Sequence, residues 1–253
     1  MSQEKILVKK NGPVTTITLN RPEVRNALDQ ASANLLTQIL RNFDADESQR
    51  VAVIAGADGA FCAGADLKET ATRVDYIAWA GHPDGPFHAP LSKPLIAAVS
   101  GHACAGGLGL ALYCDIRIAD ETAVFGVFSR RWGVPMSDGT TVRLPRIIGT
   151  GPAMDMMLTG KAVDATEALS LGLVTRISTK GNAVMDAEQL AQKMATFPQV
   201  AMLSDRRSLY AQNGCPEPDA IAFETKCAEA AKQHEAQSGA ARFAAGEGRH
   251  GAF

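Results

Sequence analysis

The sequence of 253 residues lacks the features that mark membrane, secreted and nucleic-acid-binding proteins. No apolar run approaches the ~20 residues of a membrane span, and the N-terminus has no apolar stretch long enough for a signal peptide. The 25 Lys and Arg residues are balanced by 27 Asp and Glu residues, so the basic excess of a nucleic-acid binder is missing. We therefore expect a cytoplasmic protein with no membrane and no nucleic-acid partner.

The cysteines and histidines likewise give no sign of a disulfide framework or a metal site. The five cysteines are odd in number, scattered and without a Cys-X-X-Cys pair, which is typical of reduced thiols. The five histidines show neither His-X-His nor His-X-X-X-His spacing, so we expect no bound metal. Hydrophobic residues make up 46% of the chain, which is enough for one large core.

The order of the apolar runs predicts an α/β protein. Residues 6–19 read as two strands around a turn at 11–13, and the continuous apolar runs at 51–55 and 95–99 are typical of strands covered on both faces. Helical stretches fall between strands at 107–113, 152–158 and 166–171. Strands that alternate with helices favour mainly parallel pairing.

Beyond about residue 184 the strand signal ends and the chain becomes Ala-rich with helical periodicity. We therefore expect a core over 1–195 and a helical C-terminal region over 196–253. The segment 69–92 is irregular, with several prolines and glycines, and is either a surface loop or a segment that covers a substrate.

Two segments of small residues follow the two buried strands at corresponding positions. Ala60–Leu67 follows the first strand, and Gly101–Gly109 follows the second and opens a helix. Small residues let the backbone approach a ligand closely, and a helix N-terminus carries unpaired N–H groups with partial positive charge. Each segment alone is a common turn. Together they can offer two backbone N–H groups, which is what an oxyanion hole requires.

Further short motifs occur in order along the chain. They are LNRP at 19–22, NAL at 26–28, FCAGAD at 61–66, KP at 93–94, VSGHACAGG at 99–107, CD at 114–115, FG at 125–126, RLPR at 143–146, LTG at 158–160, EA at 167–168 and GLV at 172–174. With these motifs the sequence resembles the enoyl-CoA hydratase/isomerase family, or crotonase superfamily, over nearly its whole length.

The resemblance implies a spiral of ββα units followed by a helical C-terminal trimerisation region. It implies an acyl-CoA thioester as substrate, a homotrimer or dimer of trimers, and no cofactor apart from the coenzyme A of the substrate. By position, Ala65 and Gly106 would supply the two oxyanion N–H groups. Polarising the thioester carbonyl in this way lowers the cost of an enolate.

The resemblance also suggests how coenzyme A is held. Backbone around Ala63–Asp66 would receive the adenine, and Leu67 is a further candidate for binding the substrate or its coenzyme A. Arg25 and Lys68 are candidates for the phosphates, because cations bind phosphate well. The alternative for both is a solvated surface charge.

Two positions depart from the family pattern. Hydratases of this family use two glutamates for proton transfer and water activation, and the corresponding residues here are Gly109 and Ser129. Asp138 is the nearest replacement, in a loop expected to line the acyl pocket with Trp132. Burial there would raise its pKa and suit it to general acid or base catalysis. The alternative is that Asp138 caps a helix that starts near residue 140.

Two arginines before Trp132 have two possible roles. Arg130 and Arg131 either hold a carboxylate of an acidic acyl group or, as we favour, make surface or inter-subunit salt bridges.

The leading hypothesis is an enoyl-CoA hydratase-like lyase or isomerase that stabilises a thioester enolate. One alternative is a non-catalytic acyl-CoA binder, which would take up thioesters and leave every one unchanged. Another is an enzyme of the same fold with other chemistry, such as a decarboxylase, thioester hydrolase or dehalogenase. A dinucleotide enzyme is rejected, because the glycines at 106–109 lack the GxGxxG pattern and a ribose-binding acid.

Overall fold

The computed structural model describes residues 4–73 and 86–248. The chain divides into two compact units, Met1–Met194 and Ala195–Phe253. Most of the predicted substrate-covering segment, residues 74–85, lies outside the described residues.

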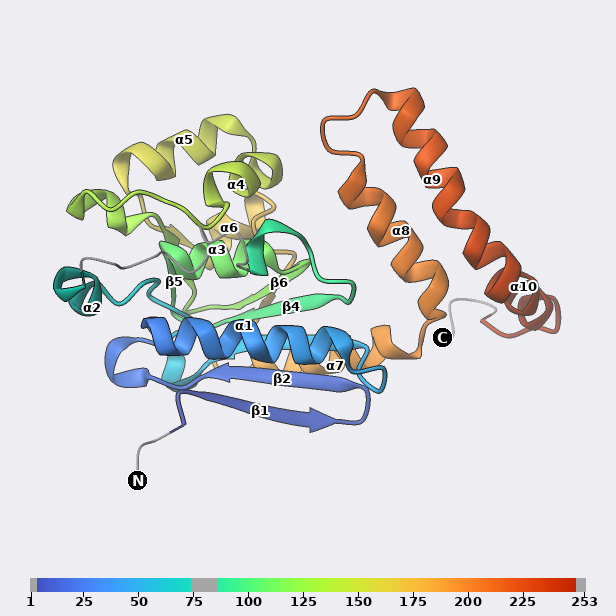
Figure 1. Cartoon of the computed structure of the whole chain (residues 1–253), viewed down its shortest axis with the longest axis horizontal. Helices are drawn as coiled ribbons and strands as arrows, with labels where there is room; N and C mark the ends of the chain where they lie inside the picture. The colour runs from blue at the N-terminus through green and yellow to red at the C-terminus, as the bar shows by residue number, and fades with distance from the viewer. Residues whose placement is uncertain (1–3, 74–85, 249–253) are drawn as a thin grey trace. The chain divides into compact units, whose positions relative to one another are not determined.

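The first unit is built on a six-stranded sheet with the order β1-β2-β3-β4-β6-β9 (Figure 1). The strands are β1 (Ile6–Asn11), β2 (Val14–Leu19), β3 (Val51–Gly56), β4 (Leu95–Val99), β6 (Ile116–Asp120) and β9 (Arg176–Ser178). The first two pair antiparallel across the predicted turn, and every other pair in this sheet is parallel. The predictions of a hairpin and of mainly parallel pairing are therefore confirmed.

The central strands β3 and β4 are covered on both faces, as their apolar runs predict. Every residue of 51–55 and 95–99 is at most 2% exposed. On one side the sheet packs against α1 (Gln30–Ala45), whose Leu36, Leu40 and Phe43 belong to the same buried cluster. Asp29 caps this helix by accepting a hydrogen bond from the Ser32 amide at 2.7 Å.

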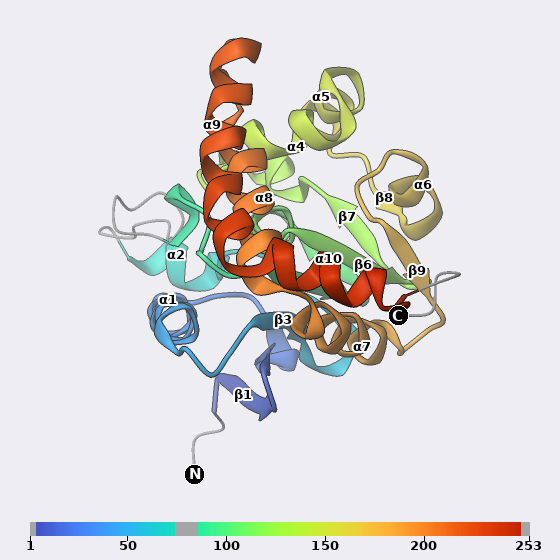
Figure 2. The same ribbon diagram turned by 90° about the vertical axis from the view of Figure 1, so that its right-hand side faces the viewer.

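A second, three-stranded sheet has the order β5-β7-β8. Its strands are β5 (His102–Cys104), β7 (Val124–Gly126) and β8 (Val163–Asp164). The sequence does not reveal β5, because its three residues lie inside a segment that reads as a glycine-rich turn. Helix α6 (Ala165–Ser170) lies beside β8 and β9 (Figure 2).

The remaining helices of the first unit begin within it, and α7 crosses its boundary with the second. They are α2 (Leu67–Thr72), α3 (Gly106–Tyr113), α4 (Thr140–Ile148), α5 (Thr150–Thr159) and α7 (Ala183–Thr196), with 3-10 turns η1 (Pro22–Val24), η2 (Ala57–Gly59), η3 (Pro86–His88) and η4 (Phe128–Trp132). The predicted helices at 107–113, 152–158 and 166–171 are present within one or two residues of their expected bounds.

The second unit is helical throughout its described part. It contains α8 (Gln199–Ala211), α9 (Glu217–Ala231), the π-helical turn η5 (Lys232–Ala236) and α10 (Gln237–Ala244). The Glu235 carboxylate accepts hydrogen bonds from the Val200 and Ala201 amides, at 3.1 and 2.8 Å, and so caps α8. Among the described residues of the whole chain, no helix combines the length and the apolar character of a membrane span.

Candidate active site

The two segments of small residues lie against each other. The Cys62 amide donates to the His102 carbonyl at 2.9 Å, and the Cys104 amide donates to the Cys62 carbonyl at 3.0 Å. These two bonds form a parallel bridge between the turn after β3 and strand β5. Because α3 begins two residues after β5, the bridge places the Ala65 backbone beside the start of that helix.

The amides of Ala65 and Gly106 are close and available. A Cβ built on Gly106 would lie 3.6 Å from the Ala65 nitrogen. Neighbouring amides are engaged, since Ala105 donates to the Gly126 carbonyl and Asp66 donates to the Leu28 carbonyl. Over the described residues, no hydrogen bond is made by the amide of Ala65 or of Gly106. Two free N–H groups at the start of a helix favour a bound oxyanion.

The turns that carry these amides require unusual backbone conformations. Gly64 has φ +94°, and a Cβ there would lie 2.8 Å from the Gly106 nitrogen and 3.0 Å from the Cys104 carbonyl oxygen. Glycine is therefore needed at residue 64 for both conformation and space. Ala105 has φ 48° and ψ −120°, a strained conformation for a residue with a Cβ. This strain lies directly before the Gly106 amide.

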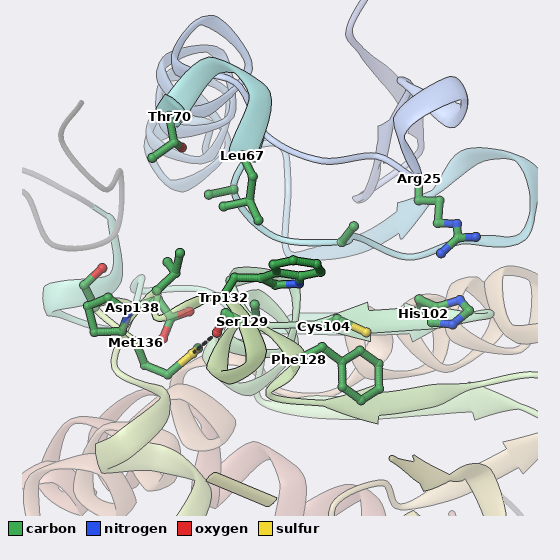
Figure 3. Close-up of a pocket in the computed structure, with 17 residues that line it drawn as sticks. Arg25, Leu67, Thr70, His102, Cys104, Phe128, Ser129, Trp132, Met136 and Asp138 are labelled. Atoms are coloured by element: carbon green, nitrogen blue, oxygen red, sulfur yellow. Dashed lines mark hydrogen bonds between the residues drawn. The ribbon is translucent and has the colours of Figure 1, made fainter. Parts of the chain in front are cut away.

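Ala65 and Gly106 both line a cavity of about 210 Å³ in the first unit (Figure 3). Its lining residues are Arg25, Ala63, Ala65, Leu67, Thr70, His102, Cys104, Ala105, Gly106, Phe128, Ser129, Trp132, Val134, Pro135, Met136, Ser137 and Asp138. Figure 3 shows Asp138 and Met136 towards one end of the cavity, and Arg25 and His102 towards the other. The cavity therefore has an anionic and a cationic end, with the Trp132 ring between them.

Asp138 is the one carboxylate among the described residues that line the cavity. The residue is 4% exposed, and its Oδ1 accepts a hydrogen bond from the Thr140 amide at 2.9 Å. Burial raises the pKa of Asp138 and outweighs the Thr140 hydrogen bond and the Arg143 cation, which lower it. Asp138 therefore contacts the first residue of α4 without being its N-cap, which is Gly139, and its buried carboxyl lies at the cavity wall.

Ser129 provides no carboxylate at the second position of the family pattern. Its side chain is buried, and the hydroxyl lies 3.5 Å from the Met136 sulfur, a weak acceptor. Trp132, three residues further along, is 74% exposed although it lines the cavity.

Other expected site residues divide into two groups. Arg25, Ala63, Leu67 and Trp132 line the cavity, whereas Asp66 and Lys68 are not among its lining residues. The Asp66 carboxylate caps α2 through the Lys68 amide at 3.1 Å and accepts a hydrogen bond from the Arg21 guanidinium at 3.0 Å.

Arg130 and Arg131 also lie outside the lining residues. Their guanidinium groups donate to the carbonyls of Met157 and Gly160, each at 3.2 Å, near the end of α5. Arginines that satisfy the last carbonyls of a helix stabilise that helix end.

Sequence reasoning did not identify His102, Cys104, Thr70 and Phe128 as lining residues. His102 and Cys104 are two residues apart on β5, so their side chains share one face of the strand. Burial raises the pKa of the Cys104 thiol to about 12, which leaves it un-ionised at neutral pH. The alternation of side chains along β5 could have identified this pair, but the glycines around the strand make the segment look like a turn.

Fold and site together define a class of protein. It is an α/β protein in which a short strand bridge brings two turns together, so that two residues with free amides and a buried carboxyl line one cavity.

Comparison with known proteins narrows this class to a family. The family model described as enoyl-CoA hydratase/isomerase matches residues 9–250. A protein named probable enoyl-CoA hydratase from Rhizobium meliloti is 43% identical over 200 residues, covering 78% of this chain and 77% of that protein. Enoyl-CoA hydratase EchA19 from Mycobacterium tuberculosis is 34% identical over 227 residues, covering 87% and 85%.

A solved structure confirms the fold. The crystal structure of enoyl-CoA hydratase EchA1 from Mycobacterium marinum aligns with a TM-score of 0.89 at 32% identity, covering 96% of each chain. The chain belongs to the enoyl-CoA hydratase/isomerase family and is an enzyme of that family with the crotonase fold.

Proposed function

We propose that this enzyme binds an acyl-CoA thioester with its carbonyl oxygen between the amides of Ala65 and Gly106, and stabilises the enolate that forms there. The observation that carries the proposal is the pair of free amides beside one cavity at the start of α3. An oxyanion hole lowers the barrier most where donors are fixed before charge develops. The bridge between Cys62 and Ala103 provides that rigidity.

Asp138 is the proposed general acid and base. It is buried, it lines the cavity, and its Oδ2 lies 3.7 Å from the position of a Cβ on Gly106. A carboxyl this close to the oxyanion turn is within reach of carbons next to a bound thioester carbonyl. A raised pKa brings the carboxyl nearer to the pH at which it both takes and returns a proton.

Coenzyme A would enter from the cationic end of the cavity. Arg25 lies there with a left-handed backbone, φ 52°, and its carbonyl accepts a hydrogen bond from the Ala63 amide at 3.0 Å. We assign Arg25 to the phosphates, the backbone near Ala63 to the adenine end, and Leu67 and Trp132 to the walls around the thioester. Lys68 is a second phosphate cation, and Asp66 contributes backbone and holds the start of α2.

The proposed reaction uses no cofactor beyond the coenzyme A of the substrate. The protein is proposed to act in the cytoplasm as a homotrimer or a dimer of trimers.

Exchange of α-protons in D₂O tests the proposal without knowledge of the natural acyl group. An enzyme with an oxyanion hole and a base catalyses deuterium uptake next to the thioester of butyryl-CoA, detected by mass spectrometry. A parallel screen with crotonyl-, malonyl- and aryl-acyl-CoA separates gain of water, loss of CO₂ and release of free coenzyme A. A protein that binds these thioesters but produces neither exchange nor turnover is a non-catalytic binder, and that result contradicts the proposal.

A further inference from the structure

Gly109 lies in the interior of α3, where a glycine costs stability relative to alanine. The residue is buried. A Cβ built on it would lie 2.9 Å from the Asp138 Cβ, and the Asp138 carboxyl carbon and Oδ2 are closer still. Real Cβ atoms do not approach other atoms this closely. Any larger residue at this position therefore displaces the Asp138 side chain.

The Asp138 carboxyl occupies the space that a side chain on residue 109 would enter. The carboxyl carbon of a glutamate lies two carbon–carbon bonds, roughly 2.5 Å, from its own Cβ. The Asp138 carboxyl carbon lies at nearly that separation from the Cβ position of Gly109. An aspartate at 109 would be about one bond too short. The Asp138 carboxyl therefore fills the space into which the side chain of a glutamate at residue 109 would extend.

Hydrogen bonds to its carboxyl and to its backbone hold Asp138 in this place. Thr140 donates its amide to Oδ1 at 2.9 Å, and Arg143 donates to the Asp138 carbonyl at 3.1 Å. Gly139, with φ +81°, allows the turn between them. The loop at 133–139 thus carries the carboxyl and holds it, while α3 contributes only the space beside Gly109.

We propose that Gly109 is a positioning residue: because it has no side chain, it leaves the space that the Asp138 carboxyl occupies, which we call the seat of Asp138. The inference rests on the proposed function of Asp138, and it adds that the acid reaches the oxyanion turn from the loop at 133–139 and not from α3. Gly109 and Asp138 then form an exchangeable pair, because only one of the two positions can occupy the seat.

The first test is Gly109→Ala, with Gly151→Ala as its matched control. Gly151 is also a helical glycine, but it has no atom within 4 Å of a built Cβ. In the exchange assay with butyryl-CoA, Gly109→Ala should lose roughly a hundredfold or more in kcat with little change in KM. Gly151→Ala should match the wild type in both. Equal exchange by wild type and Gly109→Ala overturns the positioning role and leaves the proposed function standing.

The second test is reciprocal exchange of the pair. Asp138→Gly should abolish exchange. The double variant Gly109→Glu with Asp138→Gly should exchange on the order of tenfold or more faster than Asp138→Gly, and its rate should again depend on pH as a carboxyl titrates. Failure of this double variant, when it is folded and binds coenzyme A, contradicts the shared seat.

Melting temperatures provide a readout that does not depend on activity. Gly109→Ala should lower Tm in the wild type, but not in the Asp138→Gly background, where the clash is absent. Additive Tm shifts overturn the inference. A wild type that exchanges no thioester overturns the proposed function and the catalytic part of the inference together, while this thermal cycle still decides whether the two residues share one seat.

Discussion

Gly64→Ala is the most informative substitution for the oxyanion hole, because the donors themselves are backbone amides. The added Cβ would lie 2.8 Å from the Gly106 nitrogen, so it would cover that N–H from the side that faces the Ala65 turn. Loss of one oxyanion donor costs roughly 3–4 kcal/mol, or about 10²–10³ in kcat. We expect the rate of α-proton exchange to fall by at least this factor.

The same substitution also strains the backbone at φ +94°. Such strain costs about 1–3 kcal/mol, which for a chain of this size lowers Tm by roughly 2–12 °C. Gly172→Ala is the matched control, since Gly172 has φ +73° but nothing within 4 Å of a built Cβ. Both variants should lose stability, and only Gly64→Ala should lose exchange. Exchange rates within a few-fold of each other, measured well below both melting points, would refute the reasoning.

Four further outcomes follow from the structure. Asp138→Asn should reduce exchange by roughly 10²–10⁴ with unchanged binding of coenzyme A, measured by calorimetry; near-normal exchange would remove Asp138 from the mechanism. Burial raises the pKa of Asp138 above 3.8, so the rate of exchange should decline as the pH falls through this raised pKa. The free energy of unfolding should decrease as the pH rises from 3.8 to the raised pKa, and this decrease should be absent in Asp138→Asn. Although burial opposes it, hydrogen bonds from Lys5 and Ser32 lower the pKa of Asp29 to about 2. The ionised carboxylate should therefore stabilise the folded protein fully above pH 3.8, and this stabilisation should disappear as the pH falls towards 2. Asp29→Ala should lower the free energy of unfolding in urea by about 1 kcal/mol at pH 7 and by little at pH 2. Trp132→Ala should raise KM for bulky acyl thioesters with unchanged Tm, since the side chain is 74% exposed, and an unchanged KM would argue that the ring does not touch the acyl group.

The framework of the site could be predicted from the sequence because local chemistry determines it. Continuous apolar runs at β3 and β4 indicate strands buried on both faces, and small residues after each strand indicate turns that approach a ligand. The pattern predicts only that each turn can offer a backbone N–H group, and the family resemblance is what selected Ala65 and Gly106.

The features that could not be predicted depend on contacts between distant parts of the chain. The seat of Asp138 on Gly109 joins residues that are far apart in sequence, and no local pattern shows that one residue's missing side chain accommodates another's carboxyl. The pairing of Asp66 with Arg21 has the same origin. Ala105 takes a conformation that glycine would adopt more easily, so its sequence gives no warning of the strain.

A crystal structure with a slowly reacting acyl-CoA bound tests the central claim most directly. The account predicts that the thioester oxygen lies about 2.7–3.1 Å from both the Ala65 and the Gly106 nitrogen. A thioester oxygen that contacts neither nitrogen, or only one of them, would contradict it.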